Sequence, residues 1–335
     1  MCHRFSLAGA LAVMAVACLG ATPAAAQVLA AAKATSATPY TPPRTPDGQP
    51  DIQGIWSNAS NVPLERPKNL GAKEFYTPEE LAEAQQRARQ PQANQPAVHY
   101  DLSQFGLDRA HNEIAPDLRT SLIVGPTGRI PPMLPQAQQR AAERAAKQKG
   151  HEFDGPENRG LAERCLVWGN EGPPMLPVGY NSNMQIVQGP GYVAILLEMI
   201  HDVRVIPLDG RPHAPKNIHE WLGDSRGHWE GNTLVVDTTN FTDKTHFRGS
   251  GPNLHVVERF TRTAPGTILY QFTVDDPDTW ATSWSGEVPM VSGKGPLFEY
   301  ACHEGNYGMA NVLSGARAAE KAAAEKAAAA GKTSE

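Results

Sequence analysis

The sequence predicts a mainly β fold, an antiparallel meander that closes as a barrel and follows an N-terminal part rich in helices and loops. From Met184 onward, short β-rich segments alternate with turn signals such as Thr263-Ala-Pro-Gly. The chain holds 29 prolines and 30 glycines but only 7% aromatic residues, which favours turns and loops over a helical bundle. Several of the segments also alternate apolar and polar residues with a period of two.

Residues 1–26 have the features of a secretory signal peptide. Arg4 gives a positive start, an apolar run follows, and small residues at Ala24 and Ala26 fit cleavage after Ala26. Residues 27–50 are rich in Ala, Thr and Pro and form a flexible lead-in. We therefore expect a periplasmic or secreted protein with no transmembrane segment once the signal is removed.

The cysteines support export. The signal holds Cys2 and Cys18, and the mature chain keeps only Cys165 and Cys302. An even pair in an oxidising compartment predicts a disulfide. A reactive thiol or a metal ligand stays an alternative for this pair. Cys18 also opens a lipoprotein alternative, which Ala15 disfavours because leucine is usual at that position.

The segment 51–316 is predicted as a single domain whose first part, residues 51–183, is rich in helices and loops. Thr77 is an N-cap, Pro78 suits the first turn, and Glu80 completes a capping box. The elements expected in this part are a strand at Asp51–Ser57, a helix to about Arg89, a short strand at Ser121–Val124 and a charged helix from Pro135 to about Gly150.

The second part, residues 184–316, carries the meander. The predicted strands are Met184–Gln188, a long run from Tyr192 to Ile206, Thr233–Thr238, Leu254–Thr263, Thr267–Val274, Ser283–Met290 and Leu297–Cys302. Residues 317–335 are nearly all Ala, Glu, Lys and Gly, which is typical of a semi-rigid helical spacer without a core face.

Alternation places two ionisable groups among apolar neighbours. If the run from Tyr192 is one strand, His201 shares the apolar face and Arg204 points to the opposite one. Glu258 shares a face with Val256 and Phe260. A carboxylate there must be paired or neutral, and such an environment suits an acid–base group. The open alternatives are a structural ion pair between Glu258 and an arginine such as Arg204 or Arg248, and a hydrogen-bonded core histidine.

Composition and motifs exclude several classes. The net charge is −5 and no basic stripe is present, so no nucleic-acid partner is expected. No glycine-rich nucleotide loop occurs, and no His-x-His, His-Glu-x-x-His or Cys-x-x-Cys spacing occurs. We therefore expect no cofactor and no metal. Seven of the 11 histidines fall after residue 200, so a metal site assembled from distant strands stays an alternative.

Four phrases of the chain resemble a family of secreted bacterial proteins without an established activity. They are Pro46-Asp-Gly-Gln-Pro-Asp-Ile-Gln-Gly-Ile-Trp, Arg119-Thr-Ser-Leu-Ile-Val, Gly223-Asp-Ser-Arg-Gly-His-Trp-Glu-Gly-Asn-Thr-Leu-Val-Val-Asp-Thr-Thr-Asn-Phe and Tyr300-Ala-Cys-His-Glu-Gly-Asn-Tyr. The resemblance covers nearly the whole mature chain and carries no catalytic residue with it. Gly54-x-Trp56 also resembles the opening strand of lipocalin-like barrels, in which the tryptophan closes one end.

These observations favour an exported barrel enzyme that performs metal-independent acid–base chemistry, as a lyase, isomerase or hydrolase, on a small organic molecule. The catalytic candidates are His201, Glu258, Arg204 and His303, and the substrate-binding candidates are Arg259, Asp224, Arg226, Trp229, Asn240 and Tyr307. One alternative is a non-catalytic binder of an apolar or aromatic molecule, with a pocket formed by Trp56, Phe260, Tyr270 and Phe272. The other alternative is a metal-dependent enzyme with histidine ligands.

Overall fold

The structure is a computed structural model that describes residues 40–89, 114–168, 172–178, 181–245 and 247–332. The chain divides into one unit at residues 1–38 and a second at residues 39–335, and the second holds all described residues. The predicted signal peptide and residues 27–39 of the lead-in lie outside them. None of the described helices combines the length and the apolar composition that a membrane span requires.

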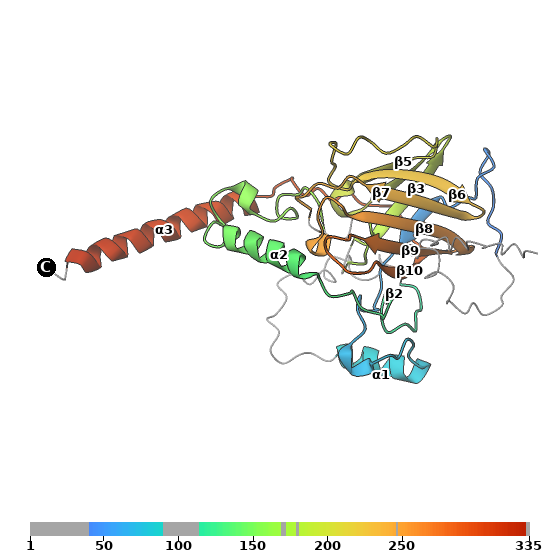
Figure 1. Ribbon diagram of the computed structural model, residues 1–335, viewed down its shortest axis with the longest axis horizontal. Coiled ribbons are helices and arrows are strands. Elements are labelled where there is room, and N and C mark those ends of the chain that lie inside the picture. The colour runs from blue at the N-terminus through green and yellow to red at the C-terminus, as the bar shows by residue number, and fades with distance from the viewer. Residues whose placement is uncertain (1–39, 90–113, 169–171, 179–180, 246, 333–335) are drawn as a thin grey trace, which may run out of the picture. The chain divides into compact units, whose positions relative to one another are not determined.

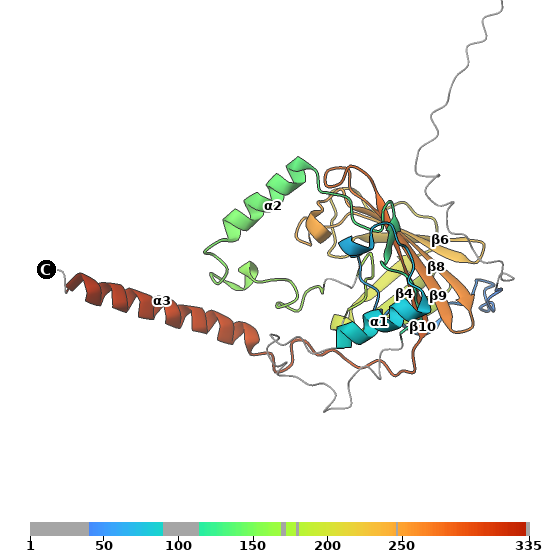
Figure 2. The ribbon, with the colours of Figure 1, turned by 90° about the horizontal axis from the view of Figure 1, so that it is seen from below.

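An antiparallel sheet forms the body of the second unit, with its strands in the order β5-β4-β3-β1-β10-β9-β8-β7-β6 and β2 paired to β10 (Figure 1). The strands are β1 (Gly54–Ser57), β2 (Ile123–Gly125), β3 (Asn183–Gly189), β4 (Tyr192–Leu197), β5 (Val203–Pro207), β6 (Asp224–Glu230), β7 (Thr233–Thr239), β8 (His255–Ala264), β9 (Thr267–Asp275) and β10 (Trp284–Ser292). The sheet nearly closes into a barrel, which confirms the predicted fold class (Figure 2).

The barrel is open along one seam, where β5 and β6 lie side by side. Within the described sheet, no backbone ladder joins these two strands. Side chains close the seam instead, because a Cβ on Gly227 would lie only 2.7 Å from Leu208 Cδ2 and 2.8 Å from Ile206 Cγ2. Glycine at this position therefore lets the apolar side chains at the β5 edge pack against β6.

Large apolar and aromatic side chains pack inside the barrel. Its largest fully buried side chains include Trp56, Tyr270, Phe260, Phe272, Met184 and Ile186. The segment 172–176 contributes Met175, which is fully buried and whose N–H donates to Tyr270 Oη at 2.8 Å. Trp56 donates from Nε1 to Ile52 O at 2.9 Å, and Arg262 lies over its ring at 5.6 Å. The aromatic residues that predicted an internal pocket therefore form the core.

The helices lie largely where the sequence predicts them. They are α1 (Pro78–Arg89), α2 (Pro135–Gln148) and α3 (Gly308–Lys332), with 3-10 turns η2 (Lys68–Leu70), η5 (Pro156–Asn158), η6 (Met199–His201) and η7 (Phe247–Gly249). The capping box is confirmed, because Thr77 N–H donates to Glu80 Oε2 at 2.8 Å and Glu80 N–H to Thr77 Oγ1 at 3.2 Å. Helix α3 includes most of the predicted spacer and begins before it, at Gly308.

The predicted disulfide is present in the structure. Cys165 and Cys302 are bonded, with Cα atoms 5.8 Å apart, across a sequence separation of 137 residues. A crosslink that closes a loop of this length stabilises a fold by about 2–5 kcal/mol, chiefly by restricting the unfolded chain in the entropic account. It holds the segment after the sheet to the segment before β3.

The prediction of one long strand from Tyr192 to Ile206 is wrong. The chain reverses after β4 through η6, where Ile200 has a left-handed φ of 60°, and returns as β5. A reversal resets the alternation, so Val203 and Val205 are 47% and 59% exposed. Arg204 instead points into the barrel and is 4% exposed. The expected placement of Arg204 on the opposite, polar face is therefore wrong as well.

The predicted strand at Leu297–Cys302 does not form. Both edges of β10 are already paired, to β9 on one side and to β1 and β2 on the other, so the chain that follows has no free edge beside it. Pro296 also removes a backbone donor from this stretch. The segment is held by Phe298 N–H, which donates to Glu198 Oε1 at 3.2 Å.

Candidate functional site

A buried ion-pair network, the interior network, links three strands inside the barrel. Arg204 on β5 donates from Nη1 to Glu258 Oε1 at 3.0 Å and from Nη2 to Oε2 at 2.5 Å. Tyr270 on β9 donates to the same Oε1 at 2.8 Å, and Glu258 on β8 is fully buried. Both carboxylate oxygens are thus engaged, in the bidentate geometry that arginine and carboxylate prefer.

Burial and charge fix the protonation of this network. Burial, aided by the Glu258 charge, raises the pKa of Tyr270 well above its usual value. Burial alone would lower the pKa of Arg204, but the neighbouring Glu258 raises it. The structure therefore adopts the ion-pair alternative for Glu258, and a substrate would have to displace Tyr270 or Arg204 to reach the carboxylate. The catalytic roles predicted for Glu258 and Arg204 stay untested.

A second network, the outer network, lies on the outward face of β6, β7 and β8. His213, from the loop between β5 and β6, bridges two carboxylates: Nδ1 is 3.0 Å from Asp224 Oδ2, and Nε2 is 2.8 Å from Asp237 Oδ1. His255 Nε2 lies 2.7 Å from Asp237 Oδ2. Arg226 completes the chain with an ion pair of 2.7 Å to Asp224. The predicted residues Asp224 and Arg226 are thus brought together here.

Asn240 positions the loop that carries His213. Asn240 has a left-handed φ of 59°. Its Nδ2 donates to the carbonyl oxygens of Ala214, Pro215 and Ile218 at 3.0–3.2 Å. The backbone of the loop is also tied to the barrel, because Ala214 N–H donates to Asp224 Oδ2 at 2.8 Å. The role of Asn240 is therefore to shape this loop, which ends close to the start of β6.

The outer network is partly open to solvent, and its pKa values shift. Burial alone would raise the pKa of Asp237, but the hydrogen bonds and charges of His255 and His213 outweigh it and lower the pKa. The hydrogen bond to Asp237 raises the pKa of His255, against the opposing effect of burial. Among the described residues, no group of three or more His, Cys, Asp or Glu side chains is arranged to hold a metal ion.

A pocket of about 240 Å³, the mouth pocket, lies at the end of the barrel where β6 begins and β7 ends. Its walls come from the segments before and after these strands, from η7 and from the segment 172–176 that enters the barrel. The lining residues are Val167, Trp168, Gly172, Pro173, Leu176, Trp221, Leu222, Phe241, Thr245, Phe247 and Arg248. Apart from Thr245 and Arg248, these side chains are apolar or aromatic.

Stacked aromatic side chains support the wall of the mouth pocket. Phe247 stacks on Trp284, with ring centroids 6.2 Å apart. Trp284 meets Trp280 and Phe272 edge to face at 5.6 Å and 6.0 Å. Trp284 is 1% exposed, so this wall is continuous with the core and its shape is preformed.

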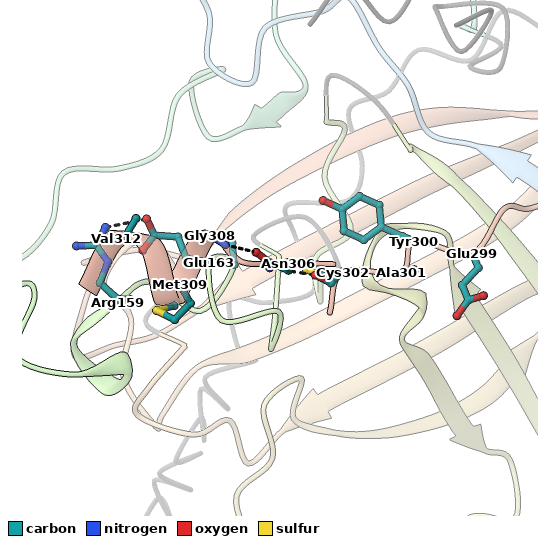
Figure 3. Close-up of a pocket in the computed structure, with 11 residues that line it drawn as sticks. Arg159, Glu163, Glu299, Tyr300, Ala301, Cys302, Asn306, Gly308, Met309 and Val312 are labelled. Atoms are coloured by element: carbon teal, nitrogen blue, oxygen red, sulfur yellow. Dashed lines mark hydrogen bonds and ion pairs between the residues drawn. The ribbon is translucent and has the colours of Figure 1, made fainter. Parts of the chain in front are cut away.

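A larger pocket of about 530 Å³ lies beside the disulfide, between the start of α3 and residues 299–302 (Figure 3). Its polar groups are largely engaged with one another. Arg159 and Glu163 form an ion pair of 2.8 Å, and Asn306 Nδ2 donates to Cys302 O at 3.0 Å. These contacts are typical of a structural junction around the crosslink.

The remaining predicted site residues do not join either network or line the mouth pocket. Arg259 lies on the outer face and pairs with Glu230 at 2.7 Å. Trp229 packs against the core, His303 is exposed and Tyr307 is 73% exposed. The side chain of His201 lies outside the described part of the structure. The catalytic role predicted for His201 therefore stays untested.

Sequence reasoning missed His213, Asp237, His255 and the walls of the mouth pocket. Asp237 belongs to the motif at 223–241, and alternation along its strand could have placed it on the outward face. Nothing in the sequence shows that His213 folds over that face, since this depends on the Asn240 contacts. Comparisons with protein-family models, curated proteins and solved structures find no match to this chain.

Proposed function

We propose that this protein binds a small apolar or aromatic molecule in the mouth pocket without transforming it. The observation that carries the proposal is the preformed cavity of about 240 Å³ at the end of the barrel, walled by Trp168, Trp221, Phe241 and Phe247. Ligand sites in proteins are concave, mostly apolar and lined by aromatic side chains with few polar groups, and they are common in the mouths of barrels.

The contrast with the interior favours binding over catalysis. Glu258, an acid–base candidate that the structure places inside the barrel, is engaged by Arg204 and Tyr270. The described residues that line the mouth pocket, in contrast, present aromatic surface, and none of them is a carboxylate or a histidine. An acid–base enzyme would need one of those groups in contact with its substrate.

The proposal places the protein outside the cytoplasm. The signal-like residues 1–26 and the disulfide between Cys165 and Cys302 support export, since such bonds persist in oxidising compartments. The resemblance to secreted bacterial proteins agrees with this reading. The intact mass of the protein purified from a bacterial periplasm is expected to match a chain that begins at Gln27. It should also be lower by the mass of the two hydrogens that are lost when the disulfide forms. A full-length or reduced mass would contradict export.

Tryptophan fluorescence tests the binding proposal, because Trp168 and Trp221 line the pocket. Titration of the mature protein with 3-phenylpropan-1-ol is expected to give saturable quenching, with the compound recovered unchanged. Trp221→Ala should weaken binding about tenfold or more, since buried aromatic contacts dominate ligand affinity. Trp221 is 37% exposed, so the variant should fold.

Tyr307→Ala is the matched control for this titration. Tyr307 is a predicted substrate-binding residue, yet it is 73% exposed and absent from the pocket lining. Its replacement should leave the affinity unchanged. If Tyr307→Ala weakens binding and Trp221→Ala does not, the mouth pocket is the wrong site. Appearance of a product in the recovered ligand would instead establish an enzyme.

A further inference from the structure

Arg248 stands out in the mouth pocket because it is a cation in a wall that is otherwise nearly apolar. Its guanidinium lies over the Phe247 ring, 6.0 Å from the centroid. Within the described residues, Arg248 makes no hydrogen bond or ion pair, whereas Arg204, Arg226 and Arg259 each hold a carboxylate. The donors of Arg248 are therefore available to a ligand.

The backbone holds Arg248 in an unusual conformation. Its φ is 48°, in the left-handed region, and the next residue, Gly249, has a φ of 87°. Most side chains avoid this region, so the contacts of η7 must hold it in place. Phe247, stacked on the buried Trp284, supplies such a contact. The turn thus keeps the guanidinium at the rim of the pocket.

The electrostatic surroundings favour an anion at this rim. Partial burial lowers the pKa of Arg248, because the guanidinium loses some of its hydration. Glu65 is the carboxylate whose charge acts on it, but Glu65 Oε1 already accepts from Ile130 N–H at 2.9 Å. A second cation, Lys244 Nζ, lies 5.9 Å from the centroid of the Trp221 ring. A partly desolvated cation gains most from an anionic partner that pairs with it directly.

We propose that Arg248 is the anion-recognition residue of the mouth pocket and that its ligand is a small aromatic or aliphatic monocarboxylate. This inference rests on the proposed function. The planar fork of the guanidinium matches a carboxylate, while the aromatic walls take the apolar body. A cavity of about 240 Å³ holds roughly eight waters at ~30 Å³ each, which fits a single ring with a short chain.

The test compares 3-phenylpropanoate with its neutral analogue 3-phenylpropan-1-ol, titrated into the mature full chain at neutral pH. The acid is expected to bind about 10- to 100-fold more tightly, the gain typical of a charge-assisted hydrogen-bonded pair. Arg248→Gln should bring the ratio of the two affinities close to one. Arg248→Lys should retain part of the preference for the acid. The control Arg211→Gln, on an exposed loop pair with Asp209, should retain it fully.

Glu65→Gln provides an independent arm that leaves the arginine in place. Removal of the competing charge should strengthen binding of the acid several-fold without changing binding of the alcohol. The glutamine can still accept from Ile130 N–H, so the fold is kept. If Arg248→Gln fails to fold, the Glu65→Gln measurement still tests whether Arg248 recognises the carboxylate.

The outcomes separate the two proposals. Equal binding of acid and alcohol to the natural protein overturns the carboxylate inference and leaves the proposed function standing. So does a preference for the acid that survives in Arg248→Gln. If neither compound binds, the proposed function itself falls, and the inference falls with it.

Discussion

The interior and outer networks both join acidic side chains to basic ones. The interior network is buried, whereas the outer network is partly exposed to solvent. Glu258 is fully buried and Arg204 is 4% exposed. In the outer network, the side chains of His255 and Asp237 are 39% and 38% exposed. The interior network gains a strong Coulomb interaction at a large desolvation cost, whereas water screens the outer one.

This difference teaches what each network can do. A buried pair cannot lose one partner without leaving an unpaired charge in a medium of low polarity, so it holds β5, β8 and β9 in one arrangement. The outer network is partly open to solvent and ties the loop that carries His213 to the barrel. That loop leads to Trp221 and Leu222 in the mouth pocket, so its stability bears on the ligand site.

The largest expected effect is in the interior. Glu258→Ala leaves Arg204 buried without its partner and should lower the free energy of unfolding by about 3–5 kcal/mol. Urea denaturation followed by circular dichroism measures it. The double variant Glu258→Leu with Arg204→Met should recover most of that loss, since apolar replacement of both members removes the unpaired charge. A loss below about 1 kcal/mol in the single variant would show that water reaches the pair.

The next effect tests the outer network at its most buried member. Asp224, 7% exposed, accepts from Ala214 N–H, lies 3.0 Å from His213 Nδ1 and forms an ion pair with Arg226. Asp224→Asn removes the negative charge and places an amide N–H group, which is a donor, beside groups that need an acceptor. We therefore expect the free energy of unfolding to fall by about 1–3 kcal/mol. Limited proteolysis should cut within residues 209–222 faster in this variant. Asp209→Asn, in the same loop, should change neither the free energy of unfolding nor the rate of cleavage. Equal effects of the two variants would mean that Asp224 does not hold the loop.

A smaller effect separates backbone strain from hydrogen bonding at Asn240. Asn240→Gly keeps the left-handed conformation and loses the bonds to three loop carbonyls, for a cost of about 1–2 kcal/mol. Asn240→Ala should cost roughly 1 kcal/mol more, because alanine disfavours this conformation. Thermal unfolding of both variants gives the difference. Identical stabilities would show that the loop relaxes and that the side chain alone matters.

The smallest effect is the pH dependence of the outer network. The pKa of His255 is raised in the folded protein, so its contribution is complete below the unfolded value of about 6.5 and fades as pH rises through the folded pKa. The pKa of Asp237 is lowered, so its contribution is present above the unfolded value of about 3.9 and is lost only in stronger acid.

The pair should therefore stabilise most between about pH 4 and pH 6.5. His255→Gln is expected to cost about 0.2–1 kcal/mol near pH 5.5 and nothing near pH 9, since the pair is partly exposed. Urea titrations at the two pH values measure this. A constant cost for His255→Gln would exclude the charged pair.

Local patterns were sufficient for most elements of the fold. The capping box at Thr77, the boundaries of α1 and the four strands from Thr233 to Met290 follow from propensity, turn residues and alternation, all of which act over a few residues. The long run from Tyr192 failed because a turn without glycine or proline interrupts it, at Ile200. The strand predicted at Leu297 failed because pairing depends on a free edge elsewhere in the sheet.

The candidate site was less predictable, for reasons of distance along the chain. Alternation of apolar and polar residues correctly predicts that Glu258 lies in the interior. Charge alone offers Arg204 only as one of the alternative ion-pair partners of Glu258, and the structure shows that the two are paired. The mouth pocket joins Val167, Trp221 and Arg248, which share no motif. Each of them is an ordinary loop residue until the barrel closes.

The sequence by itself determined the antiparallel meander, the capped helix and a cysteine pair fit for a disulfide, because these follow from short-range pattern and composition. Only the tertiary structure decided which arginine meets Glu258, that His213 folds between Asp224 and Asp237, and that Arg248 lines an aromatic pocket. The physical reason is strand register and loop closure. Both depend on packing summed over the whole barrel, and both bring together side chains that no local interaction connects.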